Sequence, residues 1–115
     1  MRRGEIRIVD FEPSRGSEAN KRRPAVVVSN DGANDRAVKL GRGVITVLPL
    51  TTNVKRIYPF QVLLPASATG LQRDSKVQGE QIRSLELDRF GRVLGSVPAP
   101  LMDQIDDAIR IHLAL

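Results

Sequence analysis

Apolar and polar residues alternate along much of the first two thirds of the chain, which is the pattern of half-buried β-strands. Near the N-terminus, Ile6 and Ile8 alternate with Arg7 and Asp10. Later apolar runs are bounded by turn-forming residues, as strands are. The predicted strands cover residues 5–11, 24–29, 43–50 and 59–64, with weaker candidates at 75–84 and 92–97. Several short strands separated by turns predict a small antiparallel barrel or sandwich.

Two polar segments interrupt this pattern. Residues 12–23 contain Pro, Gly, Ser and Asn without periodicity, which predicts a long exposed loop. Such a loop in a compact domain is more often functional than idle. Residues 31–41 are predicted to be a polar connection with at most one helical turn.

The period changes after Pro98, where apolar residues recur at the spacing of one helical face. These residues are Leu101, Ile105, Ala108, Ile109 and Leu113. Pro100 suits the first turn of a helix, and Asp103 lies where the helix dipole favours an anion. The chain is therefore predicted to be a single domain, residues 1–115, built as a β-rich barrel with a C-terminal helix.

Composition narrows the function classes. The 115 residues include no cysteine, which excludes disulfides, cysteine zinc sites and thiol catalysis. No apolar stretch approaches the ~20 residues of a membrane helix, and the N-terminus lacks the apolar core of a signal peptide. We expect a cytoplasmic protein that does not enter a membrane.

The net charge of +5 is concentrated in the first half of the chain: residues 1–60 carry 12 basic and 6 acidic side chains, and residues 61–115 carry 6 and 7. This excess fits a polyanion partner and equally fits a solvated surface. Three Phe, one Tyr and no Trp argue against RNA-binding modules that depend on aromatic platforms.

The sequence contains few candidate residues for acid–base catalysis or metal binding. His112 is the only histidine, so a catalytic histidine pair within one chain is excluded; its place late in the predicted helix favours a capping role. Asp103, Asp106 and Asp107 fit a solvated helix face better than a metal site. We expect no metal and no cofactor.

A series of short motifs runs through the chain in a fixed order. These are Arg3 to Asp10, Gly16-Ser-Glu18, Arg22-Arg-Pro-Ala-Val-Val-Val-Ser-Asn-Asp31, Val47-Leu-Pro-Leu-Thr-Thr-Asn53, Arg73-Asp-Ser75 and Glu80-Gln-Ile-Arg-Ser84. In this order and spacing they resemble the MazF, PemK and Kid family of type II toxin–antitoxin ribonucleases. The joint pattern is specific, whereas any one motif alone is not.

The resemblance implies a small antiparallel SH3-like barrel with a C-terminal helix, of the MazF and CcdB toxin type, assembled as a homodimer and inhibited by a MazE-like antitoxin. It implies sequence-specific cleavage of single-stranded RNA by attack of the ribose 2′-hydroxyl on the adjacent phosphate. That chemistry needs a proton acceptor, a donor to the leaving oxygen and stabilisation of the phosphorane charge.

Two residues match the family's catalytic positions. Arg23 precedes the strand-opening proline, and its planar guanidinium suits stabilisation of a phosphorane; a surface ion pair is the alternative. Thr51 closes the third predicted strand, where its hydroxyl would contact the scissile phosphate, unless it is an ordinary strand-end threonine.

The chain departs from Kid-type members at two positions. Ser17 stands where they have a histidine, and Glu80 where they have an aspartate, so the role of the histidine does not carry over. Glu80 fits a general base, a contact to a base edge or a buried paired carboxylate. The residues placed in RNA contact, by their nearness to the catalytic pair, are Ser17, Glu18, Lys21, Arg22, Thr52, Lys55, Glu80 and Gln81.

Two other classes of protein remain as alternatives to the ribonuclease. One is a non-catalytic toxin that resembles the gyrase-binding CcdB proteins, and the other is a plain nucleic-acid-binding barrel. The joint presence of the Arg23 and Thr51 motifs favours the ribonuclease.

Overall fold

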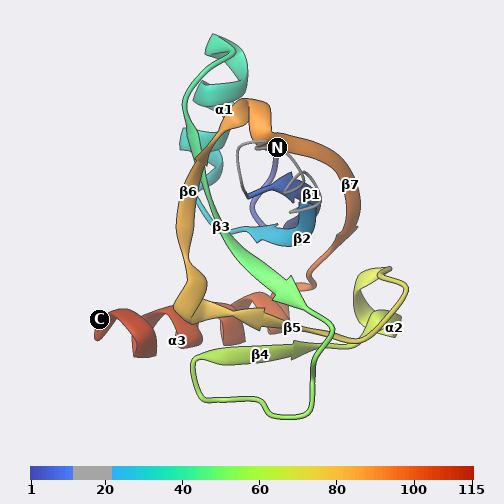
Figure 1. The fold of residues 1–115 in the computed structure, drawn as a ribbon. Helices are drawn as coiled ribbons and strands as arrows, with labels where there is room; N and C mark the ends of the chain where they lie inside the picture. Colours follow the sequence, from blue (N-terminus) through green and yellow to red (C-terminus); the bar gives the residue numbers. More distant parts are fainter. Residues whose placement is uncertain (12–21) are drawn as a thin grey trace.

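The computed structural model describes residues 1–11 and 22–115. Within them, seven strands form one antiparallel sheet in the order β4-β5-β3-β2-β1-β7, with β6 paired to β3 (Figure 1). The elements are β1 (Glu5–Asp10), β2 (Arg22–Val27), α1 (Asp31–Leu40), β3 (Val44–Thr51), β4 (Gln61–Leu64), α2 (Ala66–Thr69), β5 (Ser75–Gln78), η2 (Gly79–Gln81), β6 (Arg83–Glu86), η3 (Leu87–Arg89), β7 (Phe90–Ser96) and α3 (Ala99–Leu113). This confirms the prediction of a mainly β fold with a C-terminal helix. Closure of the sheet into a barrel is not among the strand pairings of the described residues and stays a prediction.

Residues 25–27 of β2 are buried on both faces of the sheet, which explains the apolar run in this strand. Val26 packs into a core shared with Ile105 of α3, whereas Ala25 and Val27 pack into a second core that contains Ala37 of α1. Alternate residues of one strand point to opposite faces of the sheet. Helices α1 and α3 therefore cover different cores. Helix α3 lies against β4 (Figure 1) and also contacts η2.

The C-terminal helix agrees with its prediction. Pro100 occupies the first turn, and Met102, Ile105 and Ala108 form the buried stripe. His112 lies exposed in the last turn, as expected of a residue near a helix end.

The prediction for residues 31–41 was wrong, because α1 has ten residues. Asn30 caps it, with its side-chain oxygen accepting a hydrogen bond from the Ala33 amide at 2.8 Å, and Gly41 ends it at a φ of 69°. Only Asn34 and Ala37 of this helix are buried. Two buried residues give almost no apolar periodicity, so the hydrophobic pattern did not predict this helix. The two capping residues, Asn30 and Gly41, are the signals that the sequence does contain.

The predicted strand at 75–84 was also wrong in extent, since η2 divides it into β5 and β6. The break occurs at Gly79, whose amide donates to the Phe60 carbonyl at 3.1 Å. A Cβ at Gly79 would lie 2.4 Å from that carbonyl oxygen, so only glycine fits there. In addition, β2 begins at Arg22 rather than Pro24, and the short helix α2 was not anticipated.

An ion pair within β1 positions Arg7, whose guanidinium also hydrogen-bonds to β7. The Glu5 carboxylate accepts a hydrogen bond from Arg7 Nε at 2.9 Å, and Arg7 Nη1 donates to the Gly91 carbonyl at 2.9 Å. Burial by itself raises the pKa of Glu5, but the hydrogen bonds and positive charge around it outweigh burial and hold that pKa below its ordinary value.

Candidate active site

The pairing of β2 with β3 brings the two predicted catalytic residues together. Ala25 lies opposite Pro49 in this antiparallel pair. Arg23 and Thr51 each lie two residues beyond this pair, and residues two apart on a strand point to the same face of the sheet. Both side chains line one pocket of about 510 Å³, together with Pro24, Leu50, Thr52, Ser75 and Gln78.

The Arg23 side chain is exposed at the start of β2. Because a residue before proline is restricted to extended backbone, Pro24 keeps Arg23 in the strand conformation. No described carboxylate forms an ion pair with Arg23. Its guanidinium is therefore available to an anion that enters the pocket.

The Thr51 hydroxyl accepts one hydrogen bond from the backbone. Its Oγ1 accepts from the Asn53 backbone amide at 3.2 Å, which organises the turn that follows β3. A hydroxyl that accepts in this way keeps its own O–H to donate. Thr51 can thus offer a hydrogen bond to a phosphate oxygen beside Arg23.

Two further polar residues of the pocket come from β5, and the sequence did not single them out as site residues. Ser75 Oγ donates to the Arg73 carbonyl at 3.2 Å. Gln78 has a side-chain oxygen that is buried without a hydrogen-bond partner among the described residues. The only sequence signal for either was the Arg73-Asp-Ser75 motif; an isolated glutamine at a strand end carries none.

A buried lysine holds the loop between β3 and β4 (residues 52–60). Lys76 lies opposite Thr51 in the β3–β5 pair and is 8% exposed. Its Nζ donates to the Arg56 carbonyl at 2.7 Å and lies 5.9 Å from the centre of the Tyr58 ring. The loop that carries Thr52 is therefore anchored next to Thr51, one of the two predicted catalytic residues.

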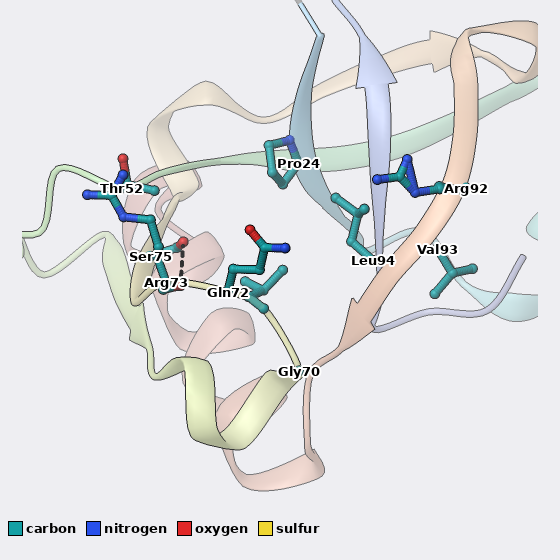
Figure 2. Close-up of a pocket in the computed structure, with 10 residues that line it drawn as sticks. Pro24, Thr52, Gly70, Gln72, Arg73, Ser75, Arg92, Val93 and Leu94 are labelled. Carbon is teal, nitrogen blue, oxygen red and sulfur yellow. Dashed lines mark hydrogen bonds between the residues drawn. The ribbon is translucent and has the colours of Figure 1, made fainter.

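A second pocket, of about 470 Å³, adjoins the first and shares Pro24, Thr52 and Ser75 with it. Figure 2 shows Thr52, Arg73 and Ser75 on one side and the β7 residues on the other, with Gln72 between them. The complete lining is Pro24, Thr52, Gly70, Leu71, Gln72, Arg73, Ser75, Arg92, Val93 and Leu94.

The other predicted RNA-contacting residues are not gathered at the first pocket. Arg22 is exposed opposite Asp10, Lys55 is exposed in the β3–β4 loop, and Gln81 is exposed in η2. None of these described residues, nor Glu80, lines that pocket. Ser17, Glu18 and Lys21 lie outside the described residues.

Of the three roles that the sequence allowed for Glu80, its contacts fit the buried, paired carboxylate better than the general base or the contact to a base edge. Its Oε2 accepts from Gln61 Nε2 at 2.8 Å, while its Oε1 is buried without a partner among the described residues. Gln61 Oε1 in turn accepts from the Tyr58 amide at 3.1 Å. Glu80 is thus linked through Gln61 to the loop that Lys76 anchors.

Two of the three acidic residues of α3 form ion pairs. Asp106 pairs with Arg3, and Asp107 with Arg110 at 3.0 Å. Across residues 1–11 and 22–115, no group of three or more His, Cys, Asp or Glu side chains is placed to hold a metal ion. In the same ranges, no helix has the length and apolar character needed to cross a membrane.

Within the described residues, the pocket around Arg23 combines a guanidinium without an ion-pair partner and a threonine hydroxyl that can donate its proton. This set suits an anion with hydrogen-bonding groups beside it, as in a phosphodiester.

Comparisons with known proteins identify the family of the chain. Residues 2–113 match the model of the PemK-like, MazF-like toxins of type II toxin–antitoxin systems. The chain is 60% identical over 115 residues to endoribonuclease MazF9 of Mycobacterium tuberculosis, covering 100% of this chain and 98% of that protein.

Solved structures share the fold. One is an endoribonuclease in complex with its cognate antitoxin from a mycobacterial species, with a TM-score of 0.78, 24% identity and coverage of 100% of this chain and 96% of that chain. Another is MazE–MazF from Deinococcus radiodurans, with a TM-score of 0.77, 28% identity and coverage of 100% and 97%. The chain therefore belongs to the family of PemK-like, MazF-like toxins of type II toxin–antitoxin systems.

Proposed function

We propose that this chain is a sequence-specific endoribonuclease that cleaves single-stranded RNA by attack of the 2′-hydroxyl on the adjacent phosphate. The bond from phosphorus to the 5′-oxygen breaks, which leaves a 2′,3′-cyclic phosphate and a 5′-hydroxyl. The observation that carries this proposal is the pocket in which Arg23, free of described ion-pair partners, lies beside Thr51.

The two residues have different roles. The Arg23 guanidinium holds two phosphate oxygens and stabilises the charge that develops on the phosphorane. An arginine side chain keeps its proton in proteins, so Arg23 is a poor proton donor, and charge stabilisation is its main contribution. Thr51 donates its O–H to the same phosphate. Because the nucleophile belongs to the substrate, this route does not require a metal-activated water.

The substrate's 2′-hydroxyl provides the decisive experiment. A short RNA is made with a single 2′-deoxy nucleotide at the mapped cut and incubated with the full chain, beside the all-RNA control in EDTA. We expect the control to be cut with 5′-hydroxyl ends and the deoxy substrate to bind but stay intact. Cleavage of the deoxy substrate, or loss of cleavage in EDTA, would contradict the mechanism, and binding without any fragments would favour a plain nucleic-acid-binding protein.

We further propose that a cognate MazE-like antitoxin inhibits the chain with an acidic segment that lies across residues 15–23. The relative from D. radiodurans is described as MazE–MazF, and acidic residues there would compete with RNA phosphates for the same cations. Inhibition should weaken as salt rises. Because Arg23→Ala is itself expected to lose activity, the test measures binding of the antitoxin: unchanged, salt-insensitive binding by the triple variant Lys21→Ala, Arg22→Ala, Arg23→Ala would place the antitoxin elsewhere.

A further inference from the structure

The pocket that adjoins the catalytic pair is built to keep its shape. Leu71 and Leu94, which form part of its wall, pack against the main hydrophobic core. At Gly95 a Cβ would lie 2.3 Å from the Thr69 carbonyl oxygen, so β7 passes unusually close to the end of α2. The wall is therefore positioned by buried contacts rather than by the pocket's contents.

Hydrogen bonds fix the segment that carries the polar lining. The Leu71 amide donates to Thr69 Oγ1 at 3.3 Å, and the Thr69 hydroxyl donates to the Pro65 carbonyl at 3.1 Å. At the other end, Asp74 Oδ1 accepts from the Ala66 amide at 2.8 Å. Gln72 and Arg73 lie between these anchors, so their backbone is held while their side chains are exposed.

The side chains present a combination of apolar surface, amide and positive charge. Leu71 and Leu94 supply apolar surface, and Gln72 lies between the two sides of the pocket (Figure 2). Arg73 and Arg92 are exposed and form no ion pair with any described carboxylate. An amide reads hydrogen-bonding edges of unstacked bases, and unpaired arginines hold phosphates.

Continuity with the first pocket restricts what can occupy the second. Pro24, Thr52 and Ser75 line both pockets, so a strand whose phosphate lies at Arg23 reaches the second pocket with its neighbouring nucleotide. The volume of about 470 Å³ lies within the ~300–1,000 Å³ range of small-molecule sites.

We propose that this second pocket is a base-recognition subsite for a nucleotide that flanks the scissile phosphate, with Gln72 as its specificity residue and Arg73 and Arg92 as its phosphate contacts. The base lies against Leu71 and Leu94, and the Gln72 amide hydrogen-bonds its edge. This inference rests on the proposed ribonuclease activity and adds the element that selects where the RNA is cut.

The test compares cleavage preference rather than activity alone. Fragment 5′ ends are mapped on one long single-stranded transcript, and kcat/KM is then measured for two short RNAs that differ only at the preferred flanking base. We expect Gln72→Ala to lower the ratio of the two kcat/KM values about tenfold, as loss of one base-specific hydrogen bond does. Gln72→Glu, which keeps the size and removes the donor, should change which base is preferred.

A phosphate contact has a different signature. Arg92→Ala should raise KM severalfold, leave the preferred base unchanged and lower the slope of log KM against log salt by roughly 0.7. The matched controls are Gln104→Ala and Arg36→Ala, exposed residues of α3 and α1 outside both pockets, for which map and KM should equal those of the wild type.

Arg23→Ala separates the two proposals. If it abolishes cleavage while both Gln72 variants keep the wild-type map and ratio, the subsite is wrong and the ribonuclease stands. The subsite would also be overturned if the fragment ends of the wild type showed no base preference next to the cut. The same holds if the Gln72 variants lost only their inhibition by the antitoxin and kept the wild-type cleavage preference. If Arg23→Ala cleaves normally, the proposed mechanism itself fails.

Discussion

Replacement of Arg23 by alanine separates lost chemistry from lost folding. The side chain is exposed and forms no ion pair with a described residue. An exposed substitution of this kind changes the free energy of unfolding by no more than ~0.5 kcal/mol. We therefore expect the melting temperature of Arg23→Ala to lie within a few degrees of the wild type.

The effect on the reaction should be much larger. Arg23 lies in the same pocket as the Thr51 hydroxyl, where a phosphorane would gain charge in the transition state. Removal of one preorganised donor to such a charge costs ~10²–10³ in rate, or ~2.7–4 kcal/mol. Arg23→Lys keeps the charge but loses the planar two-point contact, so its rate should fall between those of the alanine variant and the wild type.

The assay is single-turnover cleavage of a short RNA with the enzyme in excess, which reports the chemical step without product release. Binding is measured separately with the uncleavable 2′-deoxy RNA, for which the alanine variant should lose affinity only severalfold. Arg36→Ala, an exposed change on α1, controls for loss of general positive charge. A single-turnover rate for Arg23→Ala within about threefold of the wild type would refute the assignment, since no donor worth ~10²-fold would then have been removed.

Four further outcomes are expected. Thr51→Val should slow single-turnover cleavage by less than Arg23→Ala does, with Thr51→Ser close to the wild type; equal rates for the two Thr51 variants would exclude a role for the hydroxyl. Gly79→Ala should lower the free energy of unfolding by ~1–3 kcal/mol, seen as a lower melting temperature, because its Cβ would overlap the Phe60 carbonyl. The pKa of Glu5 is lowered in the folded state, so the ionised carboxylate stabilises the fold above its ordinary pKa of 4.5, and this contribution is lost as pH falls through the folded-state pKa. In urea unfolding, the difference in free energy of unfolding between the wild type and Glu5→Gln should therefore shrink as pH falls below 4.5. A difference that does not change with pH would contradict this prediction. Sedimentation equilibrium at micromolar concentration should show a homodimer, since two-fold pairing covers exposed edges and apolar surface of both copies, and a monomer would remove that prediction.

The sequence by itself determined the elements whose patterns are strong and local. Alternation around Ile6 and Ile8 located β1, and the spacing from Leu101 to Leu113 located α3, because each pattern reflects burial of one face of a regular element. The resemblance in motif order also singled out Arg23 and Thr51, although they are 28 positions apart in the chain. A narrow buried stripe hid α1, since two buried residues produce no readable period.

Only the tertiary structure decided how distant residues meet. The pairing of β2 with β3 brings Arg23 and Thr51 to one pocket, and the β3–β5 register places Lys76 opposite Thr51. Gln72 and Arg92 come from segments whose sequence pattern carries no sign of a shared pocket. Strand register depends on pairing between segments far apart in the chain, and a shift of one residue would reverse the face of every side chain. Local periodicity therefore predicts the elements, whereas the composition of the site follows from how the strands are paired.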